Sequence, residues 1–159
     1  MPELSPANAL LFLRDEELRQ GFDQLYFAYR DLEAASEAIL APRKLNGGHR
    51  RVLHFLAARA EIAVSELQHL LGLTKQSLGR LVDELVDQEL VKQRQGVEDR
   101  RQKLLSLTES GRALDRELWE PQRIRIARAY RDCGPQAVEG FRRVLAGLQD
   151  RARASGGRG

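Results

Sequence analysis

Two short amphipathic helices separated by a minimal turn constrain this chain more than any other feature. The apolar spacing predicts one helix over Val64–Leu71 and a second from Thr74 to about Gln88, with only Gly72 and Leu73 between them. Gly72 permits a tight turn, and Thr74 is a natural N-cap. Five leucines supply the contacts between the helices: Leu67, Leu71, Leu73, Leu78 and Leu81. The segment therefore predicts a helix-turn-helix pair.

The outer face of the second helix carries polar and basic side chains near its N-terminus. These are Lys75, Gln76, Ser77 and Arg80, and no acidic residue occurs between Glu66 and Asp83. The major groove of DNA is about 12 Å wide and bordered by phosphates, so a helix that enters it must keep carboxylates off its leading face. The positive end of the helix dipole adds attraction there. We therefore expect these four residues to contact DNA in the major groove.

A charged hairpin follows the helix pair. Residues 90–94 and 103–107 read as two short strands around a loop at 95–101. Basic residues gather around this loop: Lys92, Arg94, Arg100, Arg101 and Lys103. An arginine at such a tip can enter the minor groove, where the negative potential is strongest. We expect Arg101 in that role and Arg94 and Arg100 on phosphates.

Asp99 lies among these arginines. We expect it to fix the loop by pairing with one of their guanidinium groups, so that the arginine arrives already oriented. The alternative for the whole loop is a solvated turn with surface ion pairs, each worth about 0 to 1 kcal/mol.

Helices are predicted on both sides of this region. Steps of three and four residues indicate a long helix from Leu18 to Ile39, ended by Pro42, which should force Ala41 out of helical geometry. Asn46 then caps a helix whose apolar stripe is Val52, Leu53, Leu56 and Ala60.

Two further helices follow the hairpin. Thr108 caps the first of them, which should kink or break at Pro121 and stop at Gly134-Pro135. A last helix is expected from Gln136 to about Arg151. The apolar seams at residues 18–39 and 138–148 have heptad spacing, which favours a homodimer on palindromic DNA with half-sites roughly 34 Å apart. The alternative is that both seams pack within one subunit.

Charge is unevenly placed along the chain. Residues 1–42 carry a net charge of −5, whereas residues 43–103 and 104–159 each carry +4. Of the 26 basic residues 22 are Arg, whose planar fork suits phosphates and base edges. The distribution makes a polyanionic partner plausible, although an Arg bias also follows from a GC-rich genome.

Several other classes of protein find no support in the sequence. A chain of 159 residues with 42% hydrophobic residues is the size of one globular domain. The single Cys133 excludes an intramolecular disulfide, and no apolar run approaches the roughly 18 residues that span a bilayer. Phosphate-loop, dinucleotide and nucleophile-elbow motifs are absent, and His49, His54 and His69 form no helix-face metal pair. We expect a cytoplasmic protein without catalytic residues, metal or cofactor.

The run from Val64 to Gly111, and above all EDRRQKLLSLTESG at 98–111, resembles the winged helix-turn-helix of the MarR family of bacterial transcription regulators. The order of elements agrees over nearly the whole chain. The resemblance implies a mainly α fold in which long N- and C-terminal helices form the dimer. It makes Asp99 and Arg101 the wing pair, with Leu107 and Thr108 closing the strand and starting the next helix.

The resemblance also implies a pocket for a small aromatic or acidic effector between the dimer helices and the DNA-binding lobe. The candidates for its lining are Tyr26, Tyr29, Arg50, His54 and Trp119. Each of them is also compatible with ordinary packing. Because the family includes thiol-based sensors, Cys133 is a second route to regulation, but only Arg131 lies nearby to activate it, and we expect a buried or inert thiol.

These inferences give one intertwined domain. Residues 1–42 and 112–154 form the helical dimerisation region, residues 43–111 form the winged helix-turn-helix, and residues 155–159 form a flexible tail. The predicted function is a dimeric DNA-binding regulator, a repressor that responds to a ligand. The rival is a protein–protein adaptor that keeps the winged fold without contacting DNA.

Overall fold

The computed structural model describes residues 10–149, which divide into two units. The N-terminal unit ends at Ala35 and the C-terminal unit begins at Ser36. The last part of the predicted dimerisation region, 150–154, and the predicted tail, 155–159, lie outside the described residues.

The N-terminal unit is a 3-10 turn, η1 (Leu11–Leu13), followed by helix α1 (Asp15–Ala34). Three acidic residues in the first turn of α1 face the positive end of its dipole. No residue of α1 is buried. Most of its large apolar side chains are exposed, and only Leu32 is half-buried; the exposed ones are Leu18, Phe22, Leu25, Tyr26, Phe27 and Tyr29.

The predicted long helix over residues 18–39 is present as far as Ala34 and is interrupted near its end by a turn at Ala35 and Ser36. Ser36 is fully buried, and its Oγ donates to the Leu118 carbonyl at 3.2 Å and accepts from Gln122 Nε2 at 3.1 Å. A buried hydroxyl needs such partners, and these bonds hold Ser36 within the C-terminal unit. A short helix α2 (Glu37–Leu40) follows the turn.

Pro42 does not act as predicted either. Ala41 keeps helical angles, with φ −56° and ψ −45°, and begins a 3-10 turn, η2 (Ala41–Arg43). Pro42 fits there because the N–H that it lacks falls in a first turn, where it would need no helical partner. The chain leaves helical geometry two residues later, at Lys44, whose φ is 58°.

Helix α3 (Gly47–Ala57) begins at the predicted cap. The Asn46 side chain accepts from the Gly48 N–H at 2.9 Å. Val52, Leu53 and Leu56 are buried as expected, but Ala60 lies beyond the helix and is exposed.

The helix-turn-helix pair is confirmed as α4 (Val64–Leu71) and α5 (Lys75–Asp87). Gly72 adopts the left-handed conformation that the turn requires, with φ 62°, and the Leu73 N–H returns to the Gln68 carbonyl at 3.3 Å. The Thr74 hydroxyl accepts from the Ser77 N–H at 3.1 Å and caps α5.

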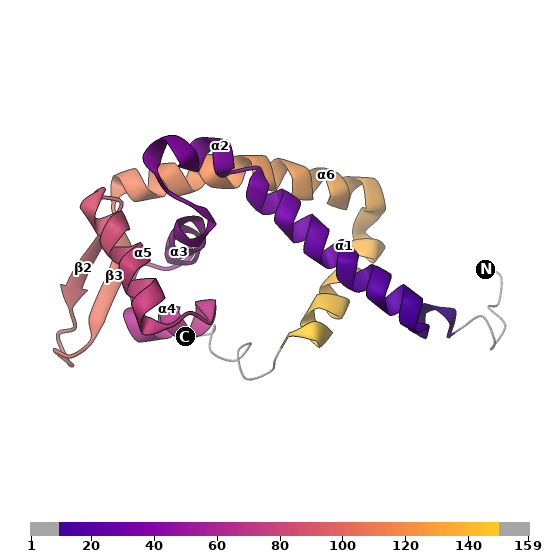
Figure 1. The fold of residues 1–159 in the computed structure, drawn as a ribbon, viewed down its shortest axis with the longest axis horizontal. Coiled ribbons are helices and arrows are strands. Elements are labelled where there is room, and N and C mark those ends of the chain that lie inside the picture. Colours follow the sequence, from indigo (N-terminus) through magenta and orange to yellow (C-terminus); the bar gives the residue numbers. More distant parts are fainter. Residues whose placement is uncertain (1–9, 150–159) are drawn as a thin grey trace. The chain divides into compact units, whose positions relative to one another are not determined.

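The hairpin is confirmed as β2 (Val91–Gln95) and β3 (Lys103–Leu107), with Val91 opposite Leu107. These two strands and the loop between them, residues 96–102, are the wing. A strand that the sequence did not reveal, β1 (Ile62–Ala63), pairs antiparallel with β3 and gives the order β1-β3-β2. β1 therefore attaches the hairpin to the start of α4. Figure 1 shows the hairpin extending away from the helices of its unit.

Helix α6 (Glu109–Leu148) begins where the Thr108 hydroxyl accepts from the Gly111 N–H at 3.0 Å. It runs through Pro121 without leaving helical geometry, so the predicted break there is wrong. The neighbouring Leu118 and Gln122 are buried, which holds this turn against α3. Gly134, with φ 80° and ψ 170°, interrupts the helix as predicted.

The core of the C-terminal unit gathers leucine side chains from α2, α3, α4, α5, β3 and α6 around one centre. Its most deeply buried large members are Leu40, Leu53, Leu56, Leu67, Leu78, Leu85, Leu105 and Leu118. Among residues 10–149, no helix is long and apolar enough to cross a membrane.

The start of α6 gives a stability prediction. A Cβ on Gly111 would lie 2.0 Å from the Leu90 carbonyl oxygen, so Gly111→Ala must push the helix away from Leu90, the residue just before β2. We expect it to lower the free energy of unfolding by about 1–3 kcal/mol, the range for overpacked cores, as measured by urea denaturation.

The matched control is Gly140→Ala in the same helix, because a Cβ there meets nothing within 4 Å. It should be neutral or stabilising, since alanine is the better helix former. Equal stability of the Gly111→Ala variant and the unsubstituted chain would contradict the close contact.

Candidate nucleic-acid interface

The first turn of α5 presents the residues that the sequence singled out. Lys75, Gln76 and Ser77 are exposed. The opposite face of the helix is buried through Leu78, Leu81, Val82 and Leu85. The core thus fixes the rotation of α5 and leaves its polar face free.

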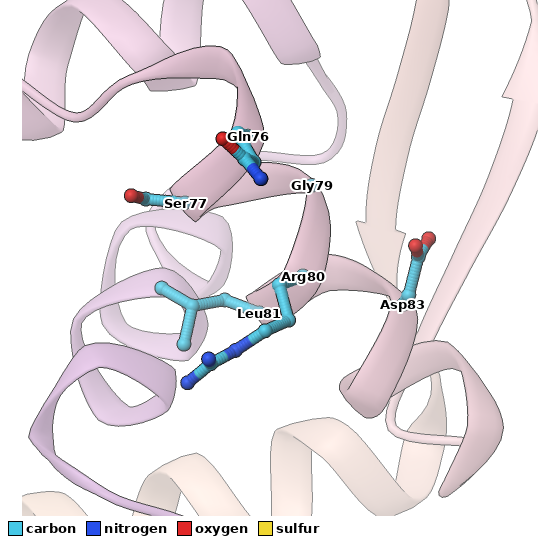
Figure 2. A pocket seen from close by; sticks show the side chains of 6 residues that line it. All are labelled: Gln76, Ser77, Gly79, Arg80, Leu81 and Asp83. Carbon is cyan, nitrogen blue, oxygen red and sulfur yellow. The ribbon is translucent and has the colours of Figure 1, made fainter.

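A hollow of about 630 Å³ lies along this face, which we name the α5 hollow. Its lining is Gln76, Ser77, Gly79, Arg80, Leu81 and Asp83 (Figure 2). Figure 2 shows the side chains of Arg80 and Asp83 pointing in different directions. Arg80 is exposed, and its Nε lies 3.6 Å from Glu84 Oε1.

Asp83 was not among the predicted site residues. The helical period could have predicted that Asp83 lies near this face, because a residue three positions after Arg80 lies on the same side of a helix. Its carboxylate places a negative charge at one end of the α5 hollow.

Arg94 lies at the end of β2 and makes a two-pronged contact with Glu61. Its Nε and Nη2 donate to the two carboxylate oxygens at 2.7 and 2.6 Å, and its Nη1 donates to the Gln95 carbonyl at 3.1 Å. Glu61 immediately precedes β1. The pair therefore joins the base of the wing to the strand that anchors it, which sequence reasoning did not foresee.

Asp99 fixes the wing loop, but not in the predicted way. Its Oδ1 accepts from the backbone N–H of Arg101 at 2.9 Å, rather than from a guanidinium group. Short-range bonds of this kind are what aspartate favours in turns. The loop is closed further by Gly96 N–H to the Gln102 carbonyl at 2.8 Å and by Gln102 N–H to the Asp99 carbonyl at 3.1 Å.

The wing and α5 share a second hollow, of about 490 Å³, which we name the wing hollow. Lys75 and Arg101, one from each element, both line it. So do residues absent from the prediction, including Gln68, Gln93 and Lys103. Arg100 is exposed in the wing loop. Of the predicted contacts, Lys75 on α5 and Arg101 on the wing thus line one hollow, together with Lys103 and Asp83.

The predicted effector residues are only partly brought together. Arg50, His54 and Trp119 form one cluster with Asp115, Leu118 and Gln122, and the His54 and Trp119 ring centres lie 5.7 Å apart. No space for a molecule the size of water remains among them. Tyr26 and Tyr29 belong to the N-terminal unit, where the Tyr29 hydroxyl donates to Glu33 at 2.9 Å.

Burial shifts two titrating groups in this cluster. It lowers the pKa of His54 below its ordinary 6.5, with Asp115 opposing and Arg50 assisting the shift. It also raises the pKa of Asp115, against the opposing charges of His54, Arg50 and Arg116. Beside them Arg50 is buried and its Nη1 donates to Gln122 Oε1 at 3.2 Å.

Cys133 is exposed, so the expectation of a buried thiol is wrong. It lies just before the Gly134 interruption, in an apolar hollow of about 270 Å³ that also includes Tyr130 and Phe141. In the part of the chain that the structure describes, no three His, Cys, Asp or Glu residues gather as metal ligands.

Two of the solved structures that share this fold hold a bound molecule. They are NadR in complex with 4-hydroxyphenylacetate, with a TM-score of 0.69 and 22% identity over 79% of this chain and 89% of that one, and a mutant of MarR from E. coli complexed with operator DNA. The latter has a TM-score of 0.65 and 19% identity, and the match covers 88% of this chain and 99% of that one. At such identities they establish the fold.

Comparison of sequences extends this result to the family. The MarR family model matches residues 44–102, from Lys44 to the end of the wing loop. The HTH-type transcriptional regulator PetP of Rhodobacter capsulatus is 46% identical over 143 residues, which are 90% of this chain and 86% of that protein. The chain therefore belongs to the MarR family of HTH-type transcriptional regulators.

Proposed function

We propose that this regulator binds palindromic operator DNA as a homodimer, with α5 in the major groove and the wing in the adjacent minor groove. The observation that carries the proposal is the wing hollow, which Lys75 of α5 and Arg101 of the wing both line. Lys75, Gln76, Ser77 and Arg80 would face base edges and phosphates, and Arg101 would enter the minor groove. The similar MarR structure that holds operator DNA supports this arrangement.

A homodimer gives the apolar surface of both units a partner. The stripe on α1 is exposed within its unit, and near the end of α6 Phe141, Val144 and Leu148 are exposed within theirs. Apolar stripes of this extent are characteristic of helices that pair with another chain. We accordingly assign residues 1–42 and 112–154 to one intertwined dimerisation region and residues 43–111 to DNA binding, in a single domain.

We further infer that the protein acts by binding rather than by catalysis, and that it works in the cytoplasm. Membership in a family of transcriptional regulators supports both inferences. A repressor that releases DNA when an effector changes the spacing of its two recognition helices fits this proposal.

The wing and α5 should contribute differently to binding. Arg101→Ala should weaken affinity for every duplex and lower the salt slope by about one, because a minor-groove arginine acts through the negative potential of the groove. Gln76→Ala should instead change base preference, because an amide on α5 acts through base edges. Both are measured by fluorescence anisotropy across salt concentrations, on duplexes that the unsubstituted protein selects from a random library.

Arg128→Ala is the control for loss of one exposed arginine, since Arg128 lies on α6 and its Nε is 4.0 Å from Asp132. It should leave the base preference unchanged. Unaltered affinity of the Arg101→Ala variant would refute the wing assignment. Failure of the unsubstituted protein to select any duplex would refute DNA binding as a whole.

Arg94 was predicted as a phosphate contact, and its pairing with Glu61 favours a bracing role. If Arg94 braces the wing, Glu61→Ala and Arg94→Ala should both weaken DNA binding by a similar factor, because each breaks the same contact. If Arg94 instead bound phosphate directly, Glu61→Ala would strengthen binding by freeing the guanidinium and removing a negative charge. If Glu61→Ala strengthens DNA binding while Arg94→Ala weakens it, the bracing role is refuted and Arg94 is a phosphate contact.

The cluster of Arg50, His54 and Trp119 in the C-terminal unit is our candidate effector site. Two basic groups and an indole ring suit an aromatic acid, and the similar NadR structure holds 4-hydroxyphenylacetate. Because no free space remains in the cluster, binding requires Trp119 or a neighbour to move.

NMR titration of His54 tests this site. In the free protein its midpoint should lie below 6.5, because burial disfavours the imidazolium. A bound carboxylate would favour the imidazolium, so 4-hydroxyphenylacetate should raise the midpoint, and the corresponding alcohol should not. A midpoint that the acid leaves unchanged would exclude this ligand from the cluster.

A further inference from the structure

We propose that His49 is a positioning residue for DNA recognition, which holds Glu84 from the core side so that the carboxylate orients Arg80 on the reading face of α5. The inference rests on the proposed function, since it assigns a source of specificity to that same surface. It is carried by hydrogen bonds that run from the cap of α3 through His49 to α5.

The first part of this connection is the cap of α3. His49 Nδ1 lies 3.1 Å from the Asn46 backbone nitrogen and completes a capping box. Because a backbone N–H can only donate, Nδ1 accepts this bond in the tautomer whose hydrogen is on Nε2. Asn46 Oδ1 also lies 3.1 Å from Nδ1, so both the backbone and the side chain of Asn46 contact the ring.

The second part is the contact with α5. His49 Nε2 donates to Glu84 Oε2 at 2.6 Å, across 35 positions of sequence. His49 is only 1% exposed, so the ring has no freedom to turn away. Most capping boxes have Glu or Gln at this position. The His49 imidazole instead contacts the cap of α3 through Nδ1 and Glu84 of α5 through Nε2.

The third part is the division of the Glu84 carboxylate between the core and the surface. Oε2 is held by His49, whereas Oε1 lies 3.6 Å from Arg80 Nε. An exposed ion pair is weak because two flexible side chains must both be ordered. Here His49 already orders the Glu84 side chain, so forming the ion pair costs conformational entropy only at Arg80.

Packing at the same point keeps the two helices in fixed relation. A Cβ on Gly48 would lie 3.2 Å from both Leu81 methyl groups and 3.0 Å from Asn46 Oδ1. The first turn of α3 is therefore in close contact with α5 one turn before Glu84. A displacement of the His49 ring would be transmitted to the carboxylate rather than absorbed by a gap.

A double-mutant cycle tests the inference. His49→Asn keeps an acceptor where Nδ1 lies but is too short to reach Glu84. We measure the affinity ratio between a duplex that the unsubstituted protein selects from a random library and the same duplex with one base pair changed. The proteins are the unsubstituted chain, Arg80→Ala, His49→Asn and the double variant.

If His49 acts through Arg80, His49→Asn should lower the discrimination ratio by about threefold or more, and Arg80→Ala should then have little further effect. Thr108→Ala is the matched control, since it removes the side-chain cap of α6 without contact to His49 or Glu84, and it should leave the ratio unchanged. Discrimination losses that simply multiply in the double variant, or an Arg80→Ala variant with normal discrimination, would overturn the inference.

Glu84→Gln gives an independent test should His49→Asn fail to fold. The amide oxygen can still accept from His49, but the negative charge opposite Arg80 is lost, so the Arg80→Ala effect should shrink in this background too. Persistence of the full effect would overturn the inference. If the unsubstituted protein selects no duplex, the proposed function fails, whereas multiplicative losses on a selected duplex refute only the role of His49.

Discussion

Burial of the inner leucine face of α5 is the constraint on which the rest of the C-terminal unit depends. Leu78 and Leu85 are fully buried among leucines of α3, α4 and β3. Because these side chains fix the rotation of the helix about its axis, the polar residues between them must point outward. The candidate reading surface is thus a consequence of core packing, and the Gly72 turn and the Thr74 cap set where α5 begins.

Polar groups buried at the edge of this core decide details that the leucines leave open. Ser36 donates to the Leu118 carbonyl and accepts from Gln122, which anchors Ser36 and the start of α2 within the C-terminal unit. His49 connects the cap of α3 to Glu84 on α5. A buried donor or acceptor without a partner costs free energy, so each such group selects one local arrangement of the backbone. These bonds, more than the apolar stripe, determine where the helices begin and end.

The candidate site was predictable wherever exposure follows from helical period. Lys75, Gln76, Ser77 and Arg80 are exposed as their spacing indicated, and Asp83 could have been added by the same rule. The roles of Arg94 and Asp99 were not predictable, because their partners are set by folding. Glu61 reaches Arg94 through the unforeseen strand β1, and Asp99 bonds a backbone N–H instead of a side chain. The sequence shows that a side chain is charged, but the group that the charge contacts depends on which residues folding brings beside it.

The sequence by itself determined the order of the long helices and the hairpin, the helix-turn-helix pair and the caps at Asn46, Thr74 and Thr108, because these depend on side-chain period and on bonds spanning a few residues. Only the tertiary structure decided the turn at Ser36, the unbroken helix through Pro121, the third strand and the partners of Arg94 and His49. Each of these joins groups far apart along the chain, and their energies depend on burial and partner geometry. Neither the burial of a residue nor the geometry of its partners can be predicted from a local pattern of residues.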